Sequence, residues 1–122
     1  MTDEQVNLAV ATRAAGRVLH RLNGEPTQGR CLEVCLATAL SFRGSPAICV
    51  CRGKAGVDGQ MKDHWWLRLV HTIIDPCADQ FISSAGRVHA QAEKDRSPVQ
   101  YEEQDCFHFR SRQILPLAGM SD

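Results

Sequence analysis

Two stretches of the chain place apolar residues at near-helical spacing. Residues Asp3 to Leu22 have an apolar side chain at every fourth position, namely Val6, Val10, Ala14, Val18 and Leu22. Residues Cys31 to Phe42 resume this spacing through Leu32, Cys35, Leu36 and Leu40. A repeat of three to four residues is typical of amphipathic helices. Glycine and proline follow each stretch, so the pattern predicts two separate helices.

The remaining apolar runs are short and rich in β-forming residues. Strands are predicted for 47–51, for His64 to Asp75 and for Glu102 to Ile114. The segment Gly53 to Lys62 contains three glycines and few apolar residues, which predicts an exposed loop. Asp79 to Asp95 is expected to form at most a short helical turn. Together these elements predict an α+β fold, with helices packed on a small antiparallel sheet.

Composition restricts the class of protein further. A chain of 122 residues with 43% hydrophobic and 23% charged residues predicts one globular domain over 1–122. Fourteen basic residues balance fourteen acidic ones, so the basic excess of a nucleic-acid binder is missing. The chain has no apolar run of about 18 residues, which argues against a membrane span. Its first residues lack a signal peptide's pattern, so we expect a cytoplasmic protein with six reduced cysteines.

Cys31 is the best candidate for a nucleophilic thiol. It follows Gly29-Arg30 at the predicted start of the second helix, where helix amides and a nearby cation stabilise a thiolate. The same amides can form half of an oxyanion hole, and Gln28 is the candidate for the other half. Cys35 lies one turn further on among apolar residues and is interpreted as a small core residue. A buried structural role remains the alternative for Cys31 as well.

His64 and Asp75 are the candidates for a general base and for the group that orients it. His64 begins an apolar strand beside Trp65 and Trp66, one of which is expected to form a wall of the cleft while the other faces the core. Asp75 ends a buried run before Pro76, and a carboxylate there is costly unless it is paired. The alternatives are a solvated histidine at a strand end and an ordinary Asp-Pro turn.

Contact between His64 and Asp75 requires the chain to reverse direction between them. Eleven residues of straight strand would separate the two by roughly 36 Å, at about 3.3 Å per residue. A hairpin turn near Val70-His71 would bring them together, although this pair lacks the glycine or asparagine of favourable hairpin turns. The catalytic hypothesis therefore depends on a turn that the local sequence does not favour.

Three segments together resemble a known family. They are Gly29-Arg30-Cys31 before a helix, His64-Trp65-Trp66-Leu67, and the run Ile73-Ile74-Asp75-Pro76-Cys77-Ala78-Asp79-Gln80-Phe81. This combination resembles small bacterial papain-like or transglutaminase-like cysteine hydrolase domains, in which threonine is usual where Cys77 stands. The resemblance covers residues 29–81.

The resemblance implies a papain-like or transglutaminase-like core and a thiol protease or amidase activity. It implies Cys31 as nucleophile, His64 as general acid and base, and Asp75 as the orienting group of a catalytic triad. Such a hydrolase or acyl transferase attacks a peptide or carboxamide carbonyl and needs no cofactor or metal. The expected partner is a peptide or protein substrate.

Two other functions remain open. One is a catalytically inactive interaction module of the same fold, which would bind a partner through 53–62 and 79–95. The other is a structural zinc site, disfavoured because paired Cys-x-x-Cys motifs are missing. Its potential ligands are Cys49, Cys51, His64, His71, Cys77, Cys106 and His108. No catalytic role is assigned to the other four histidines, which are His20, His71, His89 and His108.

Overall fold

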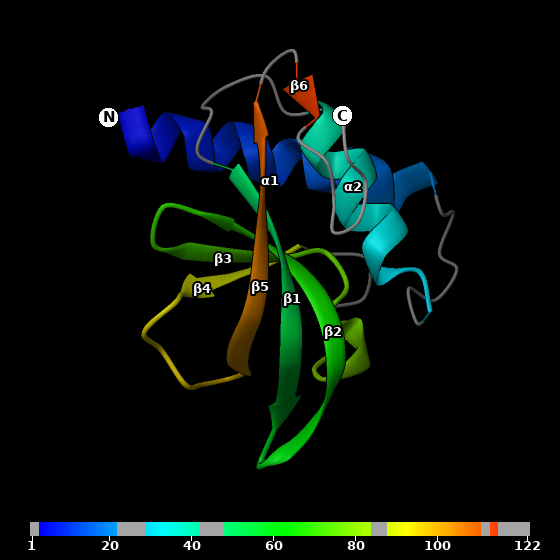
Figure 1. Ribbon diagram of the computed structural model, residues 1–122, viewed down its shortest axis with the longest axis vertical. Coiled ribbons are helices and arrows are strands. Elements are labelled where there is room, and N and C mark those ends of the chain that lie inside the picture. The colour runs from blue at the N-terminus through cyan, green and yellow to red at the C-terminus, as the bar shows by residue number, and fades with distance from the viewer. Residues whose placement is uncertain (1–2, 22–28, 42–47, 84–87, 111–112, 115–122) are drawn as a thin grey trace.

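The computed structural model describes residues 3–21, 29–41, 48–83, 88–110 and 113–114 (Figure 1). In chain order, the helices and strands are α1 (Asp3–Arg21), α2 (Cys31–Ser41), β1 (Ile48–Val57), β2 (Gln60–Leu69), β3 (Thr72–Asp75), the 3₁₀ turn η1 (Ala78–Gln80), β4 (His89–Ala92), β5 (Gln100–Arg110) and β6 (Gln113–Ile114). The strands are arranged in the order β4-β3-β2-β1-β5-β6, and every neighbouring pair is antiparallel. The predicted α+β class, with helices on an antiparallel sheet, is confirmed.

The buried face of α1 overlaps the predicted one only in part. Val6 and Val10 are 44% and 39% exposed, whereas the buried residues are Ala11, Ala14, Ala15, Val18 and Leu19. Three alanines on this face let α1 and α2 approach closely, and burying Val18 and Leu19 against α2 removes the larger apolar area from water. The prediction holds for Ala14 and Val18 and is wrong for Val6 and Val10, because the four-residue repeat gave weight to valines rather than to the alanines beside them.

The two faces of the sheet are covered differently. Alternate residues of the central strands pack toward the helices, namely Ile48, Val50, Leu67, Leu69 and Ile74. The opposite face holds a second apolar cluster that includes Cys49, Cys51, Trp66, Ile73 and Val99. In Figure 1 both helices lie at one end of the sheet, and the β1–β2 hairpin extends away from them. The central strands are therefore buried on both sides near the helices.

The predicted exposed loop at Gly53 to Lys62 is wrong, because this segment forms the outer part of the long β1–β2 hairpin. The turn is Asp58-Gly59, whose φ angles of 55° and 78° are the positive values that a tight hairpin turn needs. Gly53 was interpreted as a loop residue, but it lies at a bulge where β1 meets β5. A Cβ atom there would be 2.0 Å from the Glu102 carbonyl oxygen, so this glycine permits close strand approach.

The required reversal between His64 and Asp75 is present. β2 ends at Leu69, β3 begins at Thr72, and the two strands pair with Leu67 opposite Ile74. Val70 has a φ of 57°, an unfavourable value for a β-branched residue. The turn therefore forms against local preference, because strand pairing and burial of β3 hold it in place.

Two further predictions are refined. The Asp79 to Asp95 segment holds the expected short turn, η1, but also β4, which pairs with β3 and was not predicted. The last strand predicted over Glu102 to Ile114 is two strands: β5 begins at Gln100, so it includes Tyr101, and ends at Arg110, and β6 pairs with it. None of the six cysteines forms a disulfide. Within the described residues, no helix combines the length and apolar content of a membrane span.

Candidate active site

The first helical residue of α2 is Cys31. Gly29 precedes it with a φ of 79°, a conformation that glycine adopts without steric cost. The backbone N–H of Val34 donates a 2.9 Å hydrogen bond to the Arg30 carbonyl. Arg30 therefore caps the helix, and Cys31 occupies its first position. The sulfur therefore lies at the positive end of the helix, as the sequence predicted.

An imidazole connects this sulfur to a buried carboxylate. Cys31 Sγ lies 3.5 Å from His64 Nδ1. On the other side of the ring, His64 Nε2 lies 2.8 Å from Asp75 Oδ2. The side chains of His64 and Asp75 are fully buried. The three predicted residues thus meet in the order thiol, imidazole, carboxylate, although α2, β2 and β3 supply one each.

Asp75 accepts hydrogen bonds from three directions. Besides His64, the Tyr101 hydroxyl donates a 2.7 Å hydrogen bond to Oδ2, and the Cys77 backbone N–H donates a 2.8 Å hydrogen bond to Oδ1. A carboxylate without such donors would be costly to bury. These contacts also fix the carboxylate plane, and with it the orientation of the imidazole.

The ionisation of the two reactive groups is shifted in opposite directions. A hydrogen bond from the Cys77 thiol is the largest influence on Cys31, and with His64 and Gln80 it overcomes burial and lowers the Cys31 pKa to about 5. Burial is the largest influence on His64 and lowers its pKa, but hydrogen bonds and negative charge from Asp75 and Cys31 outweigh it. The His64 pKa is therefore raised to about 9. The favoured state between these values is a thiolate beside an imidazolium.

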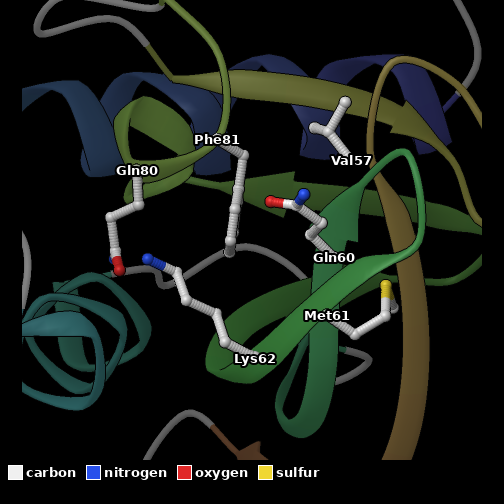
Figure 2. A pocket seen from close by; sticks show the side chains of 6 residues that line it. All are labelled: Val57, Gln60, Met61, Lys62, Gln80 and Phe81. Carbon is white, nitrogen blue, oxygen red and sulfur yellow. The ribbon is translucent and has the colours of Figure 1, made fainter.

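Gln80 is the closest polar neighbour of the sulfur on the side of η1. Its Nε2 donates a 2.7 Å hydrogen bond to Cys31 Sγ. A cleft of about 450 Å³ opens at the sulfur, and its lining residues are Gly29, Cys31, Leu32, Lys62, Asp63, His64, Trp65 and Gln80. Gln80 and Lys62 also line a neighbouring pocket of about 340 Å³. Figure 2 shows the Lys62 ammonium pointing toward the end of the Gln80 side chain.

The two tryptophans divide as predicted. Trp65 lines the cleft, whereas Trp66 is 1% exposed and packs in the apolar cluster on the opposite sheet face. The His64 ring stacks at 6.2 Å from Trp66 and meets Phe81 edge-on at 4.8 Å. Aromatic rings thus hold the imidazole on two sides and restrict its rotation.

Several polar neighbours of the site were not identified from the sequence. Cys77 and Gln80 belong to the family-like run but were given no role in catalysis, and Tyr101 was not considered. The run's position directly after Asp75 was the only available signal for the first two. The contact of Tyr101 with Asp75 depends on the pairing of β5 with β1, which no local pattern reveals. Gln28, the predicted oxyanion-hole residue, lies outside the described residues.

Comparison of the chain with protein-family models, curated proteins and solved structures finds no match.

Proposed function

We propose that the chain is a thiol-dependent hydrolase or acyl transferase with a papain-like or transglutaminase-like core. It acts on a peptide or carboxamide bond through Cys31 as nucleophile, His64 as general acid and base, and Asp75 as the orienting group. The observation that supports this most strongly is the 3.5 Å approach of Cys31 Sγ to His64 Nδ1, with Asp75 held 2.8 Å from the far nitrogen. Hydrogen-bond reach of this kind is what nucleophile activation requires.

The shifted pKa values of the two groups suit them to this reaction. With a Cys31 pKa of about 5 and a His64 pKa of about 9, the thiolate is present before substrate binds. The imidazolium beside it can donate a proton at neutral pH. Separated pKa values of this kind commonly mark groups with acid and base roles.

The reaction proceeds in two balanced steps. The Cys31 thiolate attacks the carbonyl carbon, and as the C–N bond breaks, the His64 imidazolium gives its proton to the leaving amine or ammonia. A thioester and a neutral imidazole remain. His64 then takes a proton from water, or from an amine acceptor, which attacks the thioester and releases the product and the thiolate.

Gln80 is the proposed oxyanion donor in place of Gln28. Its amide already points at the sulfur, so it also lies next to the carbon that the sulfur attacks. The amide groups of the first turn of α2 lack partners within their own helix and complete the donor set. Both donors are placed before the reaction begins, which lowers the cost of stabilising the developing charge.

The shape of the cleft favours a chain-like substrate. Trp65 and Leu32 offer apolar walls, and the neighbouring pocket beyond Lys62 and Gln80 extends the lined surface. A peptide or protein side chain carrying the amide can therefore occupy one pocket while flanking residues contact the other.

The first test measures thiol reactivity. At pH 6, iodoacetamide should label Cys31 much faster than the other five cysteines, because an unperturbed thiol is largely protonated at that pH. Peptide mapping after partial labelling gives the ratio, with half-buried Cys106 as the internal comparison. Equal, slow labelling of all six would refute an activated Cys31.

The second test measures turnover on fluorogenic peptide amides and on glutamine-containing peptides, followed by amine and ammonia release. We expect kcat/KM to rise through about pH 5 and to fall through about pH 9, following Cys31 and His64. Cys31→Ala should remove turnover while circular dichroism stays unchanged. Rapid Cys31 labelling without turnover on any substrate would favour the inactive interaction module.

A further inference from the structure

A second group of thiol and imidazole side chains gathers on β1 and β5. Of the seven potential zinc ligands in the sequence, His64 and Cys77 lie at the cleft, and His71 pairs with Glu93 at the β2–β3 turn. The remaining four lie along β1 and β5, namely Cys49, Cys51, Cys106 and His108, and three of them, Cys49, Cys106 and His108, bring their ligand atoms within 4.8 Å of one another.

Strand register places these four side chains on one face of the sheet. Cys49 lies directly opposite His108, and Cys51 lies directly opposite Cys106. Residues opposite each other in an antiparallel pair, and residues two apart in one strand, share a face. Cys49 and Cys51 are buried, whereas His108 is exposed and gives the group an open side.

The distances suit three corners of a tetrahedral zinc site. Cys49 Sγ lies 3.2 Å from His108 Nδ1. The ligand atoms of Cys49, Cys106 and His108 all lie within 4.8 Å of one another. With Zn–S near 2.3 Å and Zn–N near 2.0 Å, tetrahedral edges are about 3.7 Å for S–S and about 3.5 Å for S–N.

The surroundings suit a metal bound by two thiolates. Two thiolates, one neutral imidazole and Zn²⁺ have no net charge. Arg68 lies beside the group, with its guanidinium nitrogen 3.4 Å from Cys106 Sγ, and Glu103 accepts a 3.0 Å hydrogen bond from the same guanidinium. An N–H group that donates to a metal-bound sulfur is a common outer partner.

We propose that Cys49, Cys106 and His108 bind one Zn²⁺ that joins β1 to β5, with a water from the open side as the fourth ligand. Binding forms two Zn–S bonds, one Zn–N bond and one Zn–O bond and releases two thiol protons to solvent. Cys51, whose Sγ lies 3.9 Å from Cys106 Sγ, packs beside the site. The site shares a sheet face with His64 but is separate from the cleft. Trp66 lies between them along β2, and four strand residues from His64 to Arg68 span about 13 Å.

Cobalt substitution of the intact, reduced chain tests this site. One equivalent of Co²⁺ should produce the visible and near-ultraviolet bands of tetrahedral cobalt–thiolate coordination, and Zn²⁺ should displace it at a ratio of one per chain. Native mass spectrometry should show a single metal. His108→Asn and Cys106→Ser should each weaken binding by at least about 100-fold, since even outer partners often account for 10–100-fold.

Two control variants separate this site from the proposed catalytic one. Both variants, Cys31→Ala and His71→Asn, should keep the cobalt spectrum. Cys31→Ala should also lose turnover. If Cys106→Ser fails to fold, exposed His108→Asn gives the same comparison. The proposal is overturned if reduced protein shows no thiolate–cobalt bands, if Cys31→Ala rather than His108→Asn removes them, or if Cys51 and Cys106 form a disulfide instead.

Discussion

At the scale of single residues, the candidate site depends on donors that surround one sulfur and one carboxylate. Cys31 Sγ accepts a hydrogen bond from Gln80 and faces His64, and the Cys77 thiol is the largest influence that lowers the Cys31 pKa. Asp75 accepts from Tyr101 and from the Cys77 backbone N–H. Cys77 therefore acts on two members of the proposed triad: its thiol acts on Cys31, and its backbone N–H binds Asp75.

Replacing Cys77 should change the ionisation of Cys31. Cys77→Val removes the S–H donor, which is the largest influence lowering the Cys31 pKa. The pH at which kcat/KM and thiolate absorbance rise, called the acid limb here, should increase by about one unit or more. This is the pKa change expected from losing one hydrogen bond to a charged group.

Cys77→Thr restores a donor and should return the acid limb close to its original position. Cys35→Val is the matched control, because Cys35 is a buried thiol one turn from Cys31 that does not donate to it. An acid limb that stays in place in Cys77→Val would contradict the assigned role.

Gln80 should act on the transition state. Gln80→Ala removes the amide 2.7 Å from the sulfur and should lower kcat by about 10²–10³-fold, as expected for one oxyanion-hole donor. The labelling rate of Cys31 should change far less, because iodoacetamide develops no oxyanion there. Gln60→Ala, which alters the neighbouring pocket in Figure 2, should leave kcat within a fewfold. Equal effects of the two variants would argue against an oxyanion role.

Residue identity alone indicated the three central groups but not their partners. A thiol at a helix start, a histidine that opens an apolar run and an aspartate at a strand end each have a local signature, although the structure places His64 within β2 rather than at its start. Tyr101 has no such signature, because any donor can support a charged group once folding places it nearby. Its selection depended on strand register.

At the scale of elements, the β2–β3 hairpin determines whether Asp75 reaches His64. The turn has a positive φ at its first central residue, Val70, a position where glycine is favoured. Arg68 supports the turn by donating a 3.0 Å hydrogen bond to the Val70 carbonyl. The hairpin therefore retains local strain while it positions the carboxylate.

Val70→Gly should stabilise the protein. Relieving a β-branched residue in the left-handed region should raise the free energy of unfolding by about 0.5–1 kcal/mol, since strain of 1–2 kcal/mol is partly offset by the entropy of glycine. Urea denaturation measures the change. His71→Gly, at the adjacent turn position, should be neutral or destabilising. A loss of stability in Val70→Gly would show that the turn is not strained.

Glycines explain why one element was predicted wrongly. Gly53 and Gly56 were taken as signs of a loop, yet both lie in β1, where neighbouring backbones leave no room for a Cβ atom. The Asp58-Gly59 pair was the correct local signal for a hairpin turn. Composition alone does not distinguish glycine that permits flexibility from glycine that permits close packing.

At the scale of the whole molecule, the shifted pKa values of Cys31 and His64 couple folding to pH. Between about pH 5 and 6.5, an unfolded Cys31 holds a proton that the folded protein has released, so stability rises with pH. Between 6.5 and about 9, folded His64 retains a proton that the unfolded chain has lost, and this opposes the Cys31 contribution. The pair's contribution should therefore rise from pH 5 to 6.5 and then level off.

Urea denaturation across this range measures the coupling. The difference in unfolding free energy between the natural chain and Cys31→Ala should grow from pH 5 to 6.5, because the variant lacks the titrating thiol. A difference that is constant or falls with pH would contradict a thiolate in the folded state.

The sequence by itself determined the α+β class, the two helices and the three residue types of the candidate site. These depend on local periodicity and on the chemistry of neighbouring residues, which a linear chain already contains. Only the tertiary structure decided that the chain reverses at Val70-His71, since long-range pairing there overcomes an unfavourable turn. It also decided which thiols gather where: Cys77 beside Cys31, and Cys51 beside Cys106. Those contacts join strands and helices far apart in the chain, and packing rather than local preference selects them.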